Sequence, residues 1–264
     1  MFLAVDNIGY FYYTLNTKIK LIILKNSRVI MKAIILNSGM GTRLGELTQN
    51  NPKSLVKLNE NETIFSRAIS ILSNFDIGEF IITTGYLNEV LINYCEENFP
   101  NINFTFVHNP VYDKTNYIKS LDFIDDFEDD VILLHGDLVF ELKTAEKIIH
   151  TDESCVVVDT TLEIPKDDFK AKIKDNHIKY IGVDYFEDDA VSCQPFYKLK
   201  PEDWQAWKDN IHVFCNNDKT GVYAENALNE ITDKVIIKPL DLKGLLCMEV
   251  DNKDDLAKVK EILK

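Results

Sequence analysis

Positive charge is scarce in this sequence. Arginine occurs three times, as Arg28, Arg43 and Arg67, and 43 acidic residues outnumber 29 lysines and arginines, giving a formal net charge of −14. A nucleic-acid-binding surface needs a basic face to neutralise phosphates, so this composition argues against a nucleic-acid partner. An anion site in this chain must therefore use a few cations, backbone N–H groups or a metal ion.

Paired cysteines and long apolar runs are missing as well. The five cysteines are scattered and contain no C-x-x-C pair, which argues against a disulfide framework or a zinc site and favours the reducing cytoplasm. No apolar run reaches membrane-spanning length without a charge, so we expect no membrane insertion. No segment indicates an obligate protein partner. The content of 45% hydrophobic and 11% aromatic residues excludes a disordered chain.

The first 30 residues stand apart from the rest. They are apolar and aromatic, but they lack a basic n-region and a small-residue cleavage site, so we expect no signal peptide. Met31 then opens the run MKAIIL, which is typical of a strand buried in a parallel sheet. We therefore interpret 1–30 as an extension, poorly ordered or from an upstream start, and 31–264 as one domain. The alternative is an extra edge strand over Lys18 to Leu24.

Strand-like and helix-like segments alternate after Leu36. This succession predicts an α/β fold with a mixed, mostly parallel sheet flanked by helices, and a more antiparallel cap region at about 160–245. Asp175-Asn176 indicates a β-hairpin turn. Helices are expected at 63–75, 87–99, 116–123, 141–150, 202–213, 223–231 and 251–263, and strands at 31–36, 79–83, 103–107, 131–134, 154–159, 169–174, 177–183, 235–238 and 245–250.

A glycine-rich loop follows the first strand. It reads Leu36-Asn37-Ser38-Gly39-Met40-Gly41-Thr42-Arg43, and Pro52-Lys53 comes ten residues later. Glycines let a backbone approach a polyphosphate, and Arg43 and Lys53 add positive charge. The loop lacks the Gly-Lys-Ser/Thr end of a Walker A motif, and Leu44 replaces the third glycine of a dinucleotide fingerprint. A G-x-G alone is equally compatible with a tight strand-to-helix turn.

Carboxylates follow two apolar strands. Asp137 comes after 131–134 and Gly136, while Glu249 and Asp251 end the strand at 245–250. Open α/β sheets bind ligands at the carboxyl ends of their strands, and Mg²⁺ prefers a few carboxylates together with phosphate oxygens. The alternatives are that Asp137 is a turn residue and that Asp251 is the N-cap of the last helix.

The loop with Pro52-Lys53 resembles the signature of the nucleotidyltransferase superfamily, the GT-A-like transferases that include sugar-phosphate nucleotidylyltransferases. Within it, the sequence is most similar to the bacterial cytidylyltransferases of phosphocholine and 2-aminoethylphosphonate. The resemblance covers about 31–264. It is carried by Leu36–Gly39, Ile82–Tyr86, Asn109–Asn116, Leu134–Asp137, Tyr223–Asn226 and Met248–Asp251.

This resemblance implies a Rossmann-like fold and a Mg²⁺-dependent cytidylyltransferase. Such an enzyme couples CTP to a small phosphate or phosphonate acceptor, releases pyrophosphate, and serves cell-surface polysaccharide or phosphonate biosynthesis. The implied catalytic residues are Arg43 and Lys53. The implied nucleotide-binding residues are Leu36, Asn37, Ser38, Gly39, Gly41, Thr42, Gly85 and Tyr86; the metal ligands are Asp137, Asp251 and Glu249; and the acceptor-binding residues are Tyr112, Asn116, Tyr223 and Glu225.

Several alternatives remain open at this point. Gly85 could be only a strand-to-helix turn, and Tyr223 and Glu225 could only begin a helix. Ala224 is small where an aromatic cage for a quaternary ammonium would gain another ring, which favours a primary-amine acceptor. The competing functions are a sugar-1-phosphate nucleotidylyltransferase that uses UTP or dTTP, and an inactive nucleotide-binding regulator. His135 is expected to be a packed strand-end residue without a chemical role.

Overall fold

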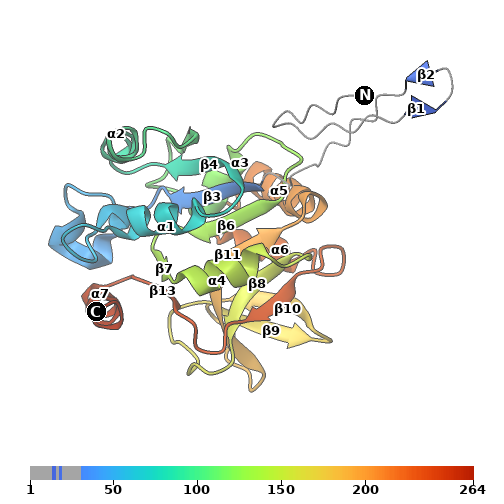
Figure 1. Ribbon diagram of the computed structural model, residues 1–264. Helices are drawn as coiled ribbons and strands as arrows, with labels where there is room; N and C mark the ends of the chain where they lie inside the picture. Colours follow the sequence, from blue (N-terminus) through green and yellow to red (C-terminus); the bar gives the residue numbers. More distant parts are fainter. Residues whose placement is uncertain (1–13, 16–17, 20–30) are drawn as a thin grey trace.

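The computed structural model describes residues 14–15, 18–19 and 31–264 (Figure 1). The rest of the expected N-terminal extension lies outside the described residues, so its interpretation as an extension stays a prediction. Within the described part, β2 (Lys18–Ile19) pairs with β1 (Thr14–Leu15) in a sheet of their own. The described residues of the suggested edge strand therefore do not extend the main sheet.

Nine strands form the main sheet among the described residues, in the order β10-β9-β11-β6-β3-β4-β5, with β8 beside β11 and β12 beside β8. The strands β6, β3, β4 and β5 are parallel, whereas β11 runs antiparallel to β6, β8 and β9. The expected mixed sheet with a more antiparallel second half is confirmed. The bounds are β3 Met31–Asn37, β4 Ile77–Thr84, β5 Phe104–His108, β6 Val131–His135, β8 Cys155–Asp159, β9 Lys170–Lys174, β10 His177–Gly182, β11 Ala190–Leu199 and β12 Lys238–Asp241.

Helices cover both faces of this sheet (Figure 1). Neighbouring residues of a strand point to opposite faces, so Ala33 and Ile35 pack with α1, α2 and α4, whereas Ile34 packs with α3, α5 and α6. Both faces are buried, which explains why β3 reads as a continuous apolar run. The helices are α1 Ile64–Leu72, α2 Asn88–Asn98, α3 Tyr117–Asp122, α4 Leu142–Ile149, α5 Pro201–Asn216 and α6 Ala224–Asn229.

A small additional layer closes one end of the sheet. There β13 (Cys247–Glu249) pairs with β7 (Leu138–Phe140), next to α7 (Lys253–Ile262) and the 3₁₀ helices η1 (Thr42–Thr48) and η2 (Lys53–Leu55). A separate apolar cluster joins these pieces; it contains Leu44, Val56, Leu58, Ile64, Val139, Val250, Leu256 and Val259. This layer carries the glycine-rich loop and the C-terminal carboxylates to the same place. Among the described residues, no helix is long and apolar enough to span a membrane.

One central element was not predicted from the sequence, the ten-residue strand β11. Pro195 obscured it, because proline cannot donate to a strand ladder. The structure accommodates this proline where the pairing register with β8 shifts, between Gln194 and Tyr197. The strand expected at 235–238 begins only at Lys238. The Asp175-Asn176 turn is confirmed, because both residues have positive φ, 54° and 59°, as a tight hairpin turn requires.

Candidate active site

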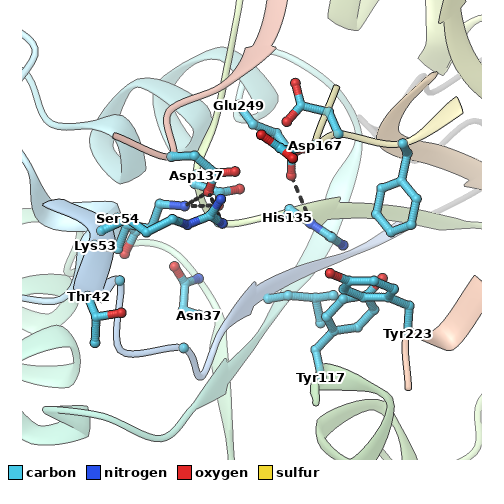
Figure 2. Close-up of a pocket in the computed structure, with 18 of the residues that line it drawn as sticks. Asn37, Thr42, Lys53, Ser54, Tyr117, His135, Asp137, Asp167, Tyr223 and Glu249 are labelled. Carbon is cyan, nitrogen blue, oxygen red and sulfur yellow. Dashed lines mark hydrogen bonds and ion pairs between the residues drawn. The ribbon is translucent and has the colours of Figure 1, made fainter. Parts of the chain in front are cut away.

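The site lies at the carboxyl ends of the parallel strands β3 and β6 (Figure 2). Leu36 pairs with His135 at the end of these two strands, and the Gly136 N–H donates to the Leu36 carbonyl at 2.9 Å. A Cβ on Gly136 would lie 2.2 Å from Asn37 Oδ1 and 2.6 Å from that carbonyl. The turn into Asp137 therefore needs glycine, because the two strand ends approach each other too closely for a side chain.

A first hollow of about 300 Å³ contains most of the expected site. The glycine-rich loop forms one wall, and Gly41 (φ 63°) turns this loop into η1 against the stem of Lys53. The lining residues are Leu36, Asn37, Gly39, Gly41, Thr42, Arg43, Lys53, Ser54, Tyr117, His135, Gly136, Asp137, Asp167, Asp168, Phe169, Val183, Tyr223, Glu249 and Asp251. Sequence positions more than 200 residues apart thus meet in one pocket.

Lys53 joins two of the expected metal ligands. Its ammonium donates to Asp137 Oδ2 and, at 2.5 Å, to Asp251 Oδ1, and Arg43 contacts the same Asp251 oxygen at 2.9 Å. Burial alone would lower the pKa of Lys53, but the attraction of the two carboxylates outweighs it and raises this pKa well above its usual value. Asp137 and Asp251 therefore come together as expected, but with a protein cation between them.

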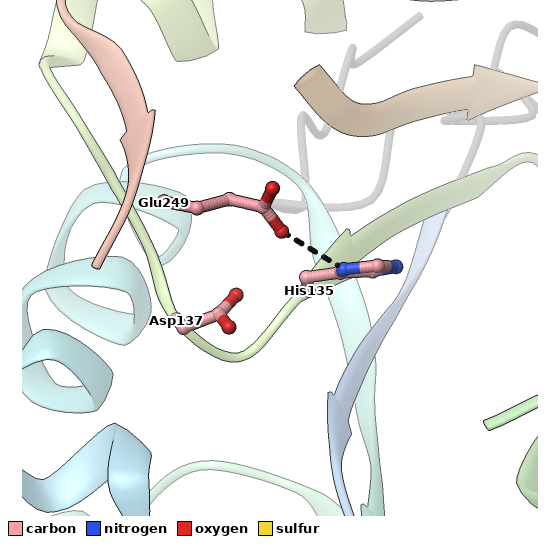
Figure 3. A group of neighbouring side chains, drawn as sticks. All are labelled: His135, Asp137 and Glu249. Atoms are coloured by element: carbon pink, nitrogen blue, oxygen red, sulfur yellow. Dashed lines mark hydrogen bonds and ion pairs between the residues drawn. The ribbon is translucent and has the colours of Figure 1, made fainter. Parts of the chain in front are cut away.

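Asp137 also faces a second group of polar side chains, His135 and Glu249 (Figure 3). Pairing of β13 with β7 sets Glu249 opposite Leu138, and His135 Nδ1 lies 3.2 Å from Glu249 Oε1. Burial raises the pKa of Glu249 to about 7, although the hydrogen bond to His135 lowers this pKa. Burial would lower the pKa of His135, but Glu249 raises it. Among the described residues, Asp137 Oδ1 and His135 Nε2 are buried without a hydrogen-bond partner.

Four rings form what we call the aromatic box: Tyr117, His135, Phe169 and Tyr223. Ring centroids lie 4.6 Å apart for Tyr117 and His135, 5.9 Å for Tyr117 and Tyr223, 5.2 Å for Phe169 and Tyr223, and 6.1 Å for His135 and Phe169. Figure 2 shows the two tyrosine rings next to His135. Asp167 and Asp168 line the same hollow. Aromatic faces beside carboxylates suit a cationic nitrogen group.

A second hollow, of about 450 Å³, adjoins the first. Its floor is a hydroxyl network in which Ser38 Oγ donates to Thr83 Oγ1 at 3.1 Å and Ser120 Oγ donates to Ser38 Oγ at 2.9 Å. The lining residues are Leu36, Ser38, Gly39, Asn109, Tyr112, Lys114, Thr115, Asn116, Tyr117, Ser120, His135, Asp137 and Gly221. The two hollows adjoin at Asp137, because five residues line both of them: Leu36, Gly39, Tyr117, His135 and Asp137.

The expected acceptor residues do not stay together. Tyr112 and Asn116 line the second hollow, beside the expected nucleotide residues, and Tyr223 lines the first. Glu225 is 1% exposed and lines neither hollow. It accepts hydrogen bonds from the hydroxyls of Tyr117 and, at 2.8 Å, Tyr197. Glu225 therefore supports the wall of the aromatic box from behind instead of facing a ligand.

Gly85 and Tyr86 also differ from expectation, since neither lines the two hollows. A Cβ on Gly85 would lie 2.6 Å from the Ser38 carbonyl and 2.7 Å from the Tyr112 side chain. The Tyr86 N–H donates to the same carbonyl at 3.3 Å, and its hydroxyl donates to the Gln49 carbonyl at 2.7 Å. This turn thus supports the glycine-rich loop from outside.

The alternative role for Asp251 is wrong. The N-cap of α7 is Asn252, whose side chain accepts from the N–H groups of Asp254 and Asp255. Asp251 instead points into the first hollow, where it meets Lys53 and Arg43. Its carboxylate is therefore part of the ion pairs that line the hollow and is not used in helix capping.

Sequence reasoning missed several residues of the pocket. His135 was expected to be a packed residue, although it stands two positions before Asp137 at the end of a buried strand, where an α/β sheet binds ligands. That position was a usable signal. No local signal pointed to the residues just before β9 that line the pocket, Asp167, Asp168 and Phe169. Only the path of the chain into β9 brings them there. Tyr117, a candidate on the acceptor side from the sequence, lies at the start of α3 and lines both hollows.

Known nucleotidyl transferases are similar to this chain. The family model described as "Nucleotidyl transferase" matches residues 32–169. The CTP:phosphoglutamine cytidylyltransferase of Campylobacter jejuni is 35% identical over 135 residues, which cover 48% of this chain and 52% of the relative. The CMP-5′-(3-aminopropyl)phosphonate synthase of Streptomyces rubellomurinus is 29% identical, and the match covers 49% of this chain and 20% of the relative. The chain thus spans about half the length of the first relative and a fifth of the second.

Other matches span nearly the whole fold. The choline-phosphate cytidylyltransferase of Streptococcus pneumoniae is 26% identical over 243 residues, covering 89% of this chain and 99% of the relative. The solved CTP:phosphocholine cytidylyltransferase from S. pneumoniae has a TM-score of 0.69 at 22% identity, covering 89% of this chain and 100% of the other. The inositol-1-phosphate CTP transferase from T. maritima has a TM-score of 0.72 at 17% identity, covering 89% and 95%. The chain belongs to the nucleotidyl transferase family.

Proposed function

We propose that this protein transfers a cytidylyl group from CTP to a small phosphorylated or phosphonate acceptor that carries a nitrogen head group, with release of pyrophosphate. The observation that carries the proposal is the pair of adjoining hollows with Asp137 at their junction. One hollow combines the glycine-rich loop with two cations and the aromatic box. The other has the size and mixed polar lining that a nucleoside needs.

The phosphates of CTP would bind along the glycine-rich loop. Gly39 lines both hollows, and no atom of the described residues lies within 4 Å of a Cβ built on it, so a phosphate can approach its backbone. Lys53 and Arg43 supply positive charge from one side of the hollow. Lys53 would contact the α-phosphate region and Arg43 the leaving pyrophosphate, because charge accumulates at both places during transfer.

A divalent cation fits the acidic side of the pocket. Asp137, Glu249 and Asp251 provide carboxylates, and the buried Asp137 Oδ1 lacks a partner among the described residues. When bound, Mg²⁺ or a similar ion would neutralise charge on the phosphates of CTP and the acceptor. A phosphate monoester is already largely dianionic at pH 7, so the chain needs no general base to activate it. Its residues therefore act by alignment and charge neutralisation.

The acceptor would place its nitrogen group in the aromatic box. Tyr117, Phe169 and Tyr223 line this hollow with aromatic rings, and Asp167 and Asp168 add negative charge. This combination is better suited to an aminoalkyl or ammonium head group than to an uncharged sugar. The choice of CTP is supported by the relatives, several of which are cytidylyltransferases by name.

The test is a matrix of nucleotides and acceptors with pyrophosphate release as the readout. CTP, UTP, dTTP and ATP would each be combined with phosphocholine, phosphoethanolamine, 2-aminoethylphosphonate, a phosphorylated amide and glucose-1-phosphate, with and without Mg²⁺. We expect turnover with CTP and at least one nitrogen-bearing acceptor. Faster turnover of glucose-1-phosphate with UTP or dTTP would show a sugar nucleotidylyltransferase instead, and no turnover with any pair would favour an inactive regulator.

Within the pocket, Tyr223→Ala should raise the KM for the acceptor much more than the KM for CTP. Tyr223 is half-exposed and contacts other rings of the aromatic box, so its removal opens the acceptor side without touching the glycine-rich loop. Tyr185→Ala is the matched control, because that tyrosine lies on the cap region and does not line either hollow. Equal increases in both KM values would contradict the assignment of the aromatic box to the acceptor.

A further inference from the structure

We propose that His135 is a nitrogen ligand of the divalent cation, through Nδ1, and that the site consequently binds Mn²⁺ or another first-row transition dication more tightly than Mg²⁺. The proposal deepens the function proposed above, since it rests on a metal site at Asp137. It adds a ligand of a different chemical type, and with it a metal preference that carboxylates alone would not produce.

The donor atoms are already gathered. One ligand atom each from His135, Asp137 and Glu249 lies within 4.8 Å of the others (Figure 3). His135 Nδ1 and Glu249 Oε1 are 3.2 Å apart, close to the roughly 3 Å that separates neighbouring ligands in an octahedron with ~2.1 Å bonds. Figure 3 also shows that Nδ1 is the ring nitrogen that faces Glu249.

Asp137 can serve this group without releasing Lys53. Its Oδ2 accepts from the Lys53 ammonium, while Oδ1 is buried and has no partner among the described residues. Lys53 and Arg43 both contact Asp251, so this carboxylate already has cations beside it. The side of Asp137 that faces His135 and Glu249 has no lysine or arginine contact of this kind in the part of the chain that the structure describes. A metal ion there would supply the missing positive charge.

The nitrogen donor sets the metal preference. Mg²⁺ is a hard ion that favours oxygen ligands and near-ideal octahedral geometry. Imidazole nitrogen instead favours transition dications, and their affinity for such ligands exceeds what carboxylates alone provide. His135 therefore gives this site a preference that a leucine or asparagine at the same position would remove.

Mn²⁺ binding measures this preference without any turnover. Free Mn²⁺ would be quantified by electron paramagnetic resonance with the full-length protein, with and without CTP, and Mg²⁺ affinity would be obtained by competition. Pulsed measurements on bound Mn²⁺ would report a directly coordinated ¹⁴N nucleus. The variants are His135→Leu, which removes the nitrogen, and His135→Asn, which offers an amide oxygen. His212→Gln is the matched control, because His212 is exposed on α5 and pairs with Asp122.

We expect a ¹⁴N signal in the wild type and in His212→Gln, and its loss in both His135 variants. The ratio of Mn²⁺ to Mg²⁺ affinity should fall at least about tenfold in His135→Leu, and similarly in His135→Asn. A change in the position of Glu249 would alter Mn²⁺ and Mg²⁺ affinity alike, so it cancels in the ratio. Melting curves identify a variant that fails to fold.

Three results would overturn the proposal. The first is bound Mn²⁺ with an oxygen-only spectrum in the wild type, and the second is an unchanged ¹⁴N signal in both His135 variants. The third is absence of Mn²⁺ binding at millimolar concentration, even with CTP. Each of these leaves the nucleotide-transfer matrix as a separate test, so failure of the metal ligand and failure of the proposed function are distinguishable.

Discussion

Replacing Lys53 by methionine removes one ammonium group and keeps most of the side-chain volume. In the wild type this group sits between Asp137 and Asp251, and all three side chains are only 15–16% exposed. Without it, the two carboxylates face each other with Arg43 as the remaining cation at Asp251. Breaking a buried ion pair from one side costs about 3–5 kcal/mol, because the partner stays buried without compensation.

The expected loss here is smaller than that range. Arg43 still compensates Asp251, and the carboxylates keep some contact with water, so we expect a loss of about 2–3 kcal/mol in the free energy of unfolding. For a chain of this size this corresponds to a fall in Tm of about 5–10 °C. Lys57→Met is the matched control, because Lys57 is exposed on the same segment and should change stability by less than about 0.5 kcal/mol.

Divalent cations should reverse part of the effect of Lys53→Met. A metal ion can occupy the space between the two carboxylates, and an ion at 100 times its Kd adds about 2.7 kcal/mol of stability. We therefore expect millimolar Mg²⁺ or Mn²⁺ to raise the Tm of Lys53→Met more than that of the wild type, measured by scanning calorimetry. In the double variant with Asp251→Asn, the loss caused by Lys53→Met should shrink, because fewer like charges remain. A Lys53→Met protein as stable as the wild type would refute the reasoning. The free-energy cost of burying the Lys53 ammonium would then equal the stabilisation that it gains from Asp137 and Asp251.

Three further predictions concern the loop, the last helix and the start of the domain. Asp251→Asn should cut turnover about a hundredfold with little effect on Tm. Asn252→Ala should instead cost about 1 kcal/mol of stability with little effect on turnover, because Asn252 caps α7. The opposite pattern in paired melting and kinetic assays would restore the capping role of Asp251. Gly136→Ala should destabilise the protein strongly, since the new Cβ would meet the backbone. Gly39→Ala should fold normally and lose CTP affinity in calorimetric titrations. Equal stability of the two variants would contradict this prediction. A chain that starts at Met31 should keep the activity and Tm of the full chain, and a loss of several degrees would show that residues 1–30 contribute to the folded domain.

Much of the local structure could be predicted from the sequence. The apolar run at 31–36, the helical spacing at 63–75 and the hairpin turn at Asp175-Asn176 depend on nearest neighbours, and the structure contains each of them. The glycine-rich loop was recognisable because it follows a strand, and the carboxylates because they end strands. β11 was not, since a proline within an apolar run removes the local signal while its pairing with β6, β8 and β9 supplies the stability.

The sequence by itself determined the fold class and the kind of site, a phosphate-binding one. Apolar periodicity decides which segments can be buried as strands or helices, and the order of glycines and cations in one loop predicts a phosphate site. Tertiary structure alone decided the partners within the site. Lys53 meets Asp251 across 198 positions, and His135 meets Glu249 across 114, because β13 pairs with β7 beside the end of β6. Such contacts depend on the order of strands in the sheet and on the path of the chain between them. Cooperative burial of the whole core determines both, so no local sequence pattern predicts these contacts.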